Sequence, residues 1–360
     1  MTGARSVRSP ASGKVRVARL TDLAALGELS RLCQDDADST RSLGLPVSGR
    51  PIGVFSLFRL PLGAFQPHDL MYVYEESGRL SGLIRVERDT VRDEWTIVEL
   101  DGIGSGPVGD IRFRLVNQVV REANKRGPWR LHVACTDQDG NVELFMQAGF
   151  ARYGDERILH RPGDRPLPDA WTEKQAQAAG IRPAVALDAL HLARLYAAAT
   201  PQPVQRLEGI RLPDWERQGT NWRVPRSSLA PILRFADVEA FVQESPDGTT
   251  AAKGGTGLSA FAQIGVAKED QPHYLKILAR PDSDVAALTE FALGVIRSRT
   301  ERDAAAQRGP GVIAPVRTYE APIDRRLEEA GFGTIATVTL LMKDTLVRVA
   351  EPALVPAGVR

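Results

Sequence analysis

The side chains with the most versatile chemistry in this sequence are five histidines and two cysteines. Metal sites and nucleophilic hydrolases need such groups at short fixed spacings or in recognisable motifs. No two histidines stand at a metal-ligand spacing, none lies beside a cysteine in a zinc-type arrangement, and no G-x-S-x-G turn occurs. The sequence therefore predicts neither a metal site nor a Ser-His-Asp triad. These residues are His68, His132, His160, His191, His273, Cys33 and Cys135.

Simpler roles suit the cysteines and His132. Two cysteines are too few for a disulfide framework, so we expect two free, buried thiols. His132 lies in RLHVAC, where apolar residues alternate with it. Such alternation is typical of a strand, and it favours His132 as a residue of the less apolar strand face over His132 as a catalyst.

A short helix that ends in Ala-Gly-Phe occurs twice, in NVELFMQAGF at 141–150 and in PIDRRLEEAGF at 322–332. The spacing of Val142, Phe145 and Met146 predicts that they share one stripe of the first helix. In both copies the glycine can take the left-handed conformation that caps a helix, and the phenylalanine can pack back on it. The chain thus repeats one local motif far downstream.

The beginnings of the two halves also match. KVRVARLTD followed by LAALGELSRLC, at 14–35, has the same strand-then-helix order as GIRPAVALD followed by ALHLARLYA, at 180–197. Asp22 then corresponds to Asp188, an offset of 166 residues, whereas the two glycine stops are 182 apart. A tandem duplication with about sixteen extra residues in the second copy accounts for both offsets.

Between these landmarks, both halves show the same order of elements: two strands, a third strand, a helix and a further strand. Apolar periodicity and turn residues mark each element, and they do so more weakly in the second half. The strands are expected at 71–77, 83–89, 95–100 and 130–135 with a helix at 109–126, and then at 238–244, 261–267, 274–280 and 311–316 with a helix carrying Val285, Leu288, Ala292 and Val295.

Length and composition bound the domain organisation and the class of protein. At 360 residues the chain favours two domains of similar length. We expect a disordered tail at 1–13, a first domain at 14–163, a Pro-rich linker at 164–179, a second, degenerate domain at 180–347 and a C-terminal tail at 348–360.

The charge balance predicts which partners the protein lacks. Its 46 Lys and Arg against 45 Asp and Glu give a net charge of +1, so no global field would hold it on nucleic acid or on an anionic membrane. The arginine-containing start is not followed by an apolar core, which argues against a signal peptide, and no apolar run is long enough to span a bilayer. We therefore expect a cytoplasmic protein, with a homodimer as a possible assembly.

The order strand, helix, hairpin, strand, helix, strand, short helix ending in Gly-Phe, strand resembles the GNAT acetyltransferase superfamily. The resemblance covers nearly the whole chain as two copies, and its most specific part is EANKRGPWRLHVACTDQDGNVELFMQAGF. It implies two tandem α/β domains, each a mixed, mostly antiparallel sheet flanked by helices. In each, the sheet would splay between its fourth and fifth strands, with the pantetheine of coenzyme A in the gap.

The resemblance assigns roles to two residues of the short helix. In the family, an asparagine that opens this helix and a tyrosine four residues before its glycine often serve coenzyme A binding and protonation of the thiolate. Asn141 matches the first position, whereas Phe145 stands at the second. Phe145 can donate no proton, which implies a slower or rearranged reaction, and its simpler interpretation is a core residue at helical spacing.

A diphosphate-binding loop of the form Q/R-x-x-G-x-G/A is also implied, entering the third helix so that backbone N–H groups and the helix dipole hold two phosphates. Counting back from the helix end places PVGDIR at 107–112 there. Asp110 and Arg112 then stand at the two positions where the family has small residues, and the alternative role of Asp110 is to cap the helix. In the second half the corresponding ARPDSDVAAL has no glycine. The cofactor-binding candidates are Val108, Gly109, Asp110, Ile111, Arg112, Asn141 and Phe145.

Carboxylates on the splayed strand are the candidates for a catalytic base. Glu99 and Asp101 alternate in IVELDG, so they share one face, and either could deprotonate an amine if burial raised its pKa. The commoner arrangement would be an exposed carboxylate at the sheet edge. Glu320 is a weaker candidate in the second half.

Two functional hypotheses follow from these observations. The first is an acetyl-CoA-dependent N-acetyltransferase that acts on a small-molecule amine, with the first domain as the active copy. The second is a catalytically inactive binding or regulatory protein that keeps the fold. Phe145, Asp110 and the glycine-free second loop favour the second hypothesis, while Asn141 and the glycine-rich first loop favour the first.

Overall fold

The structure is a computed structural model that describes residues 13–33, 43–45, 69–89, 92–103, 108–216, 226–229, 233, 235–245, 257–267, 271–301 and 311–345. The predicted terminal tails lie almost wholly outside these residues. Residues 104–107, just before the predicted diphosphate-binding helix, also lie outside the described residues.

Each half has the predicted strands and helices. The first half contains β1 (Lys14–Val17), α1 (Leu23–Leu32), β2 (Asp69–Glu76), β3 (Arg79–Asp89), β4 (Glu94–Gly102), α3 (Val108–Arg126), β5 (Arg130–Cys135), α4 (Asn141–Gln147) and β6 (Ala151–Arg161). The second half contains β7 (Ile181–Pro183), α6 (Ala189–Ala199), α7 (Gln202–Glu208), α8 (Leu212–Glu216), β8 (Phe235–Glu244), β9 (Leu258–Ala267), β10 (His273–Ala279), α10 (Ala286–Glu301), β11 (Val312–Arg317), α11 (Ala321–Glu329) and β12 (Gly333–Asp344).

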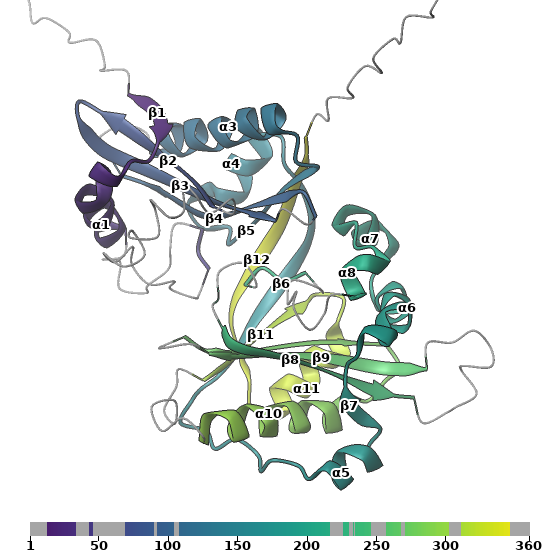
Figure 1. The fold of residues 1–360 in the computed structure, drawn as a ribbon. Coiled ribbons are helices and arrows are strands. Elements are labelled where there is room, and N and C mark those ends of the chain that lie inside the picture. The colour runs from purple at the N-terminus through teal and green to yellow at the C-terminus, as the bar shows by residue number, and fades with distance from the viewer. Residues whose placement is uncertain are drawn as a thin grey trace, which may run out of the picture.

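All twelve strands form one sheet in the order β1-β2-β3-β4-β5-β12-β6-β11-β10-β9-β8-β7. The order is symmetric about its centre when each strand of the first half is matched with the strand six places later. Within each half the pairing is antiparallel except for β4 with β5 and β10 with β11, which are parallel. The fold class is therefore the predicted one, two mixed and mostly antiparallel units with flanking helices (Figure 1).

The two units exchange their last strands. β12 pairs with β5 of the first half and β6 pairs with β11 of the second half, while β6 and β12 pair with each other at the centre. These two long strands cross between the upper and lower units in Figure 1. The apolar core of the first unit accordingly includes Leu229, Tyr274 and Ile313 from the second half of the sequence.

A repeated ion pair at the two helix starts shows the duplication at the level of side chains. Arg16 donates two hydrogen bonds to Asp22, and Asp22 also accepts the backbone N–H of Arg19. Arg182 and Asp188 make the same fork, at 2.8 Å for both bonds, and Asp188 accepts the N–H of Val185. Every pair is offset by the 166 residues that the sequence indicates.

The two glycine-stopped helices have the predicted caps. Gly149 and Gly331 have φ of 85° and 91°, and the N–H of each following phenylalanine bonds back to a carbonyl five residues earlier. The predicted apolar stripe of α4 was wrong in one residue. Met146 is 55% exposed, and Leu144 is buried beside Phe145, because the helix packs with a face rotated toward Leu144.

The predicted linker contains a helix of its own, α5 (Glu173–Ala178). Thr172 caps it, and the Gln175 side chain bonds back to the Thr172 N–H, which makes a capping box. Before this helix, Trp171 packs edge-to-face on Phe291 of α10, so the linker is attached to the second unit.

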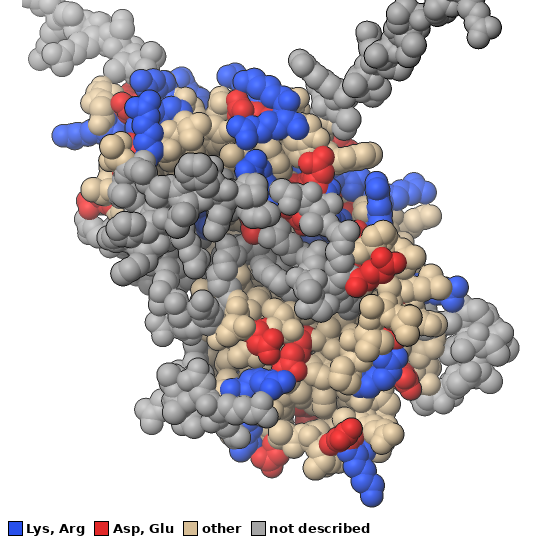
Figure 2. Space-filling model, in the orientation of Figure 1, with Lys and Arg blue, Asp and Glu red and all other residues tan. Residues whose placement is uncertain are grey.

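Acidic and basic side chains are interspersed over the face of the molecule seen in Figure 2, in keeping with the net charge near zero.

None of the helices in the described ranges is both long enough and apolar enough to cross a membrane.

Candidate functional site

The sheet opens where β4 and β5 part. The two strands pair in register only from Glu94 with Arg130 to Ile97 with Val133. Beyond Ile97, β4 carries an extra residue relative to β3 and runs on to Gly102, while β5 runs on to Cys135. The result is the predicted splay between the fourth and fifth strands of the first unit.

A small cavity of about 20 Å³ lies where these strands part, which is room for about one water molecule. Its walls come from β4, β5, β6 and β12 and from a segment of the second half, Arg226–Ser228, so both halves of the sequence build it. Its described lining residues are Leu45, Thr96, Ile97, Val98, His132, Val133, Ala134, Tyr153, Arg226, Ser227, Ser228 and Leu340.

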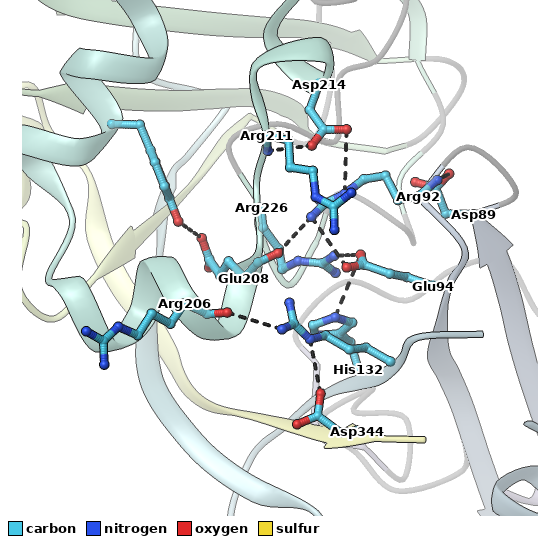
Figure 3. A network of polar contacts seen from close by, with 12 residues as sticks. Asp89, Arg92, Glu94, His132, Arg206, Glu208, Arg211, Asp214, Arg226 and Asp344 are labelled. Atoms are coloured by element: carbon cyan, nitrogen blue, oxygen red, sulfur yellow. Dashed lines mark hydrogen bonds and ion pairs between the residues drawn. The ribbon is translucent and has the colours of Figure 1, made fainter. Parts of the chain in front are cut away.

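Glu94 is the centre of a buried polar network beside this cavity (Figure 3). Its carboxylate contacts the guanidinium of Arg226, lies 3.4 Å from that of Arg92 and is 3.7 Å from Nε2 of His132. Burial alone would raise the pKa of Glu94, but the charge of Arg226, the contact with His132 and the charge of Arg92 together outweigh it, and the pKa lies well below its usual range. Glu94 is therefore a fixed negative charge.

His132 stands between this carboxylate and the cavity. Its side chain is 3% exposed, and neither ring nitrogen has a hydrogen-bond partner within the described part of the chain. Burial, reinforced by the charge of Arg226, lowers the pKa of His132 to about 4. The imidazole is thus neutral at physiological pH and could accept a proton.

A second buried cluster ties Glu208, Arg226 and Ser228 to the centre of the sheet. Arg317 on β11 bonds to Glu208 at 2.6 Å, lies 3.2 Å from the carboxylate of Glu156 and also donates to the carbonyl of Arg226. Glu156 in turn accepts the backbone N–H of Ser228 at 2.8 Å. The Arg226–Ser228 wall of the cavity is therefore held by ionic contacts across the junction of the two halves.

The predicted catalytic carboxylates lie on β4, but not at the cavity. Glu99 and Asp101 are each 3% exposed, and Glu99 pairs with Arg85 of β3 at 2.9 Å. The expectation of an exposed sheet-edge carboxylate was wrong, because β3 flanks this part of β4 and both side chains are covered. Neither residue is among the described residues that line the cavity.

The predicted diphosphate-binding residues form the first turn of α3. The side chains of Val108, Gly109 and Asp110 lie outside the described part of the structure. Ile111 packs in the first core, and Arg112 is only 4% exposed. Arg112 lies near Cys135 at the end of β5, where its charge partly offsets the burial that raises the pKa of that thiol to about 12.

Asn141 and Phe145 are both fully buried in α4. The ring of Phe145 packs edge-to-face on Phe150, with centroids 5.3 Å apart, within the apolar core. Its interpretation as a core residue is therefore confirmed. Cys33 and Cys135 are free thiols, as predicted, although Cys33 is only partly buried.

In the second unit, the equivalent opening between β10 and β11 is filled. These strands pair only from His273 to Tyr274. Just beyond that point Lys276, which is 1% exposed, reaches from β10 to the carbonyl of Pro315 on β11 at 3.2 Å and to Glu320 at 2.9 Å. Glu320 is thus the partner of a buried lysine. A lysine side chain occupies the gap that the first unit leaves open.

The buried histidines should make the fold sensitive to mild acid. His273 accepts the Ala267 N–H through Nδ1, and burial lowers its pKa to about 4, as for His132. An unfolded histidine titrates near 6.5, so below that pH the unfolded chain binds more protons and folding loses free energy as the pH falls toward 4. We expect a loss of roughly 2 kcal/mol per histidine between pH 7.5 and 5.0.

Urea unfolding at the two pH values measures this loss. A His273→Gln variant, which keeps an acceptor for the Ala267 N–H, should show a smaller drop than the wild type. If the free energy of unfolding fell equally in the wild type and the variant, the acid sensitivity could not be attributed to His273.

Sequence reasoning missed His132, Glu94 and Arg226 as members of one site. The RLHVAC alternation placed His132 on a strand, but the partner strand that brings Glu94 beside it depends on sheet register. Arg226 arrives from the other half of the chain, and no local pattern signals that.

Comparisons with known proteins bear on the fold. No known family profile and no curated protein matches the sequence. Among solved structures, a tandem GNAT protein from the clavulanic acid biosynthesis pathway, solved without acetyl-CoA, is similar with a TM-score of 0.56 and 13% identity, over 92% of this chain and 98% of that one. A GCN5-related N-acetyltransferase from Sphaerobacter thermophilus is similar with a TM-score of 0.50 and 15% identity, over 92% and 95%. With its symmetric strand order and its β4–β5 splay, the chain has the fold of the tandem GNAT acetyltransferases.

Proposed function

We propose that the protein is an acetyl-CoA-dependent N-acetyltransferase that acts on a small-molecule amine, with its active site in the first unit. The observation that carries the proposal is the contrast between the two openings. The β4–β5 gap leads to a cavity lined by both polar and apolar side chains, whereas Lys276 fills the β10–β11 gap. The second unit supplies the Arg226–Ser228 wall, which gives it the role of closing the first unit's cleft.

Acyl transfer to an amine needs three provisions, and the first unit has groups for each. The pantetheine arm needs an extended groove, which would run along the unpaired part of β4 and β5. The diphosphate needs N–H groups and positive charge, for which the first turn of α3 and Arg112 are the candidates. The amine needs a proton acceptor near the thioester, and neutral His132 lies at the cavity.

Calorimetric titration with acetyl-CoA tests the proposal. We expect one site per chain, lost in Ala134→Leu, which fills the cavity from β5. Ala279→Leu is the matched control, because Ala279 is equally buried at the end of β10 in the second unit and should leave binding unchanged. Thermal melts check that both variants fold, since overpacking costs about 1–3 kcal/mol. Loss of binding in Ala279→Leu alone would move the site to the second unit.

Asp110 should weaken coenzyme A binding in the wild type. An aspartate in the first turn of α3 favours the helix by roughly 0.3–1 kcal/mol. At about 5 Å and an effective dielectric near 20, its repulsion of one phosphate charge is roughly 3 kcal/mol, or ~100-fold in affinity. We therefore expect Asp110→Gly to tighten acetyl-CoA binding by up to ~100-fold at a small stability cost, and Arg112→Ala to weaken it.

Titrations of both variants at one salt concentration measure these changes. If Asp110→Gly leaves the affinity unchanged or lowers it, the loop does not hold the diphosphate. The second candidate function, a binding or regulatory protein without catalysis, would then replace the first. Phe145 favours that candidate, because it offers no proton to a leaving thiolate where the resemblance implies a tyrosine.

A further inference from the structure

We propose that His132 carries the proton in the acyl transfer, taking it from the amine nitrogen and delivering it to the departing sulfur of coenzyme A. This inference rests on the proposed function, and it names the residue that would replace the proton donor missing at Phe145.

The position of His132 is the first argument. It lies on β5 opposite Thr96, one pair before the last paired residues of the two strands. It lines the cavity at the vertex of the opening, together with Thr96 and Val98 of β4 and Ala134 of β5. A thioester that entered along the gap would meet the imidazole at the point where β4 and β5 come together.

The unmet hydrogen-bonding capacity of His132 is the second argument. Buried polar atoms nearly always have a partner, yet both ring nitrogens lack one among the described residues, and Glu94 at 3.7 Å is too distant for a hydrogen bond. A 3% exposed imidazole in the wall of a cavity is therefore free to bond to a molecule that occupies it.

The surrounding charges suit a proton carrier. Glu94 lies on one side of the imidazole, Arg226 and Arg92 act on it through their charges, and the ring of Tyr153 meets it edge-on at 6.4 Å. Burial and the two arginines keep His132 neutral at rest, which the acceptor role needs. Once a proton arrives, the fixed carboxylate of Glu94 stabilises the imidazolium, so Glu94 acts as a positioning residue.

The lone pair of the neutral amine forms a bond to the thioester carbonyl carbon, and the carbonyl π electrons move to oxygen. His132 accepts the proton from the nitrogen, which has become acidic on forming this bond. The tetrahedral intermediate then re-forms its carbonyl, the C–S bond breaks with its electrons on sulfur, and the imidazolium protonates that sulfur. The products are the amide and the free thiol, and His132 is neutral again.

None of the other three candidates fits this role. Glu99 is held by Arg85, and Asp101 lies further along the same strand, away from the cavity. Phe145 has no exchangeable proton. His132 is the titratable side chain that reaches the cavity without a committed hydrogen bond, within the described lining.

Labelling of the full-length protein with bromoacetyl-CoA tests the proposal without any knowledge of the acceptor. If the acyl group lies at the cavity, an imidazole nitrogen of His132 displaces bromide from the α-carbon. A new N–C bond forms, bromide leaves, and the other ring nitrogen loses its proton to water. Peptide mass spectrometry should locate the label on His132, and excess acetyl-CoA should prevent it.

The pH dependence of the labelling rate separates a reactive His132 from a His132 with a purely structural role. Because the pKa of His132 is about 4, its labelling rate should differ by less than about twofold between pH 6 and pH 8, whereas an ordinary histidine would react faster as it deprotonates near 6.5. His132→Gln should remain unlabelled there while it still binds acetyl-CoA. His160→Gln, on β6 and outside the cavity lining, is the matched control and should be labelled like the wild type.

The outcomes separate this proposal from the proposed function. If calorimetry detects no acetyl-CoA binding to the wild type, the proposed function fails and this inference fails with it. If acetyl-CoA binds but the reagent labels another residue, or nothing, His132 is not the proton carrier and the proposed function stands. Competitive, pH-independent labelling of His132 supports both.

Discussion

Replacing Arg317 by methionine should reduce the free energy of unfolding by about 3–5 kcal/mol, the cost of leaving a buried charge without its partner. Arg317 is 3% exposed and lies between Glu208 at 2.6 Å and Glu156 at 3.2 Å, both of them buried. Its own burial lowers its pKa, but these two carboxylates outweigh that effect and the pKa stays well above its usual value. Without Arg317, two carboxylates would remain in a low-dielectric site, where their hydrogen-bond partners among the described residues, Tyr196 and Ser228, are neutral.

Urea unfolding of Arg317→Met measures this loss. Arg299→Met is the matched control, because Arg299 forms a two-bond fork with Glu239 but is 35% exposed, so its loss should cost less than about 1 kcal/mol. If the two variants lose similar stability, the junction network contributes no more than a surface ion pair. Arg317→Met should also weaken acetyl-CoA binding, since Arg317 holds the Arg226 carbonyl beside the cavity.

Local features of the fold could be predicted from the sequence because their causes are local. The sequence predicted the two matching strand-then-helix starts, at 14–35 and 180–197, and the glycine stops of α4 and α11, and each of these arises within a few residues of chain. The strand and helix periods follow from which side chains must be buried. These signals were enough to find a duplicated α/β fold.

The exchange of β6 and β12 could not be predicted in the same way. β6 could have paired with β5, and β12 with β11, within its own half of the sequence. Both β5 and β11 are buried strands that stand last in the strand order of their own half. The choice depends on contacts between distant segments, among them the bonds from Glu156 of β6 to Arg317 and Ser228 of the second half. A single sequence carries no pairwise signal for such contacts.

The site was predicted in part for the same reason. Its frame, the β4–β5 splay and the first turn of α3, follows from the resemblance. The catalytic base was predicted at Glu99 or Asp101, because alternation on one strand was the available signal. The structure brings together His132, Glu94 and Arg226, which come from two strands and a distant segment, at the cavity. Burial of a polar side chain depends on what packs over it, which alternation does not report.

Replacing Lys276 by methionine should cost about 3–5 kcal/mol, because it leaves Glu320 buried without its cation. Glu320 is 6% exposed, and its remaining side-chain donor among the described residues would be the backbone N–H of Arg317. The double variant Lys276→Met with Glu320→Gln should recover part of this loss, since a neutral amide can still accept that N–H. Lys125→Met is the surface control, because Lys125 is 68% exposed and its pair with Glu122 should contribute less than about 1 kcal/mol.

Opening the second gap should not create a second acetyl-CoA site. Lys276→Ala would remove the side chain that bridges β10 and β11, yet Asp284 already caps the start of α10 by accepting the Ala286 N–H at 3.0 Å. A carboxylate thus occupies the place where a diphosphate would have to bind, and it would repel one. Calorimetry of Lys276→Ala should still give one site per chain. If calorimetry gives two sites, Lys276 alone keeps the second unit from binding acetyl-CoA. The difference in binding between the two units would then come from one side chain and not from their phosphate loops.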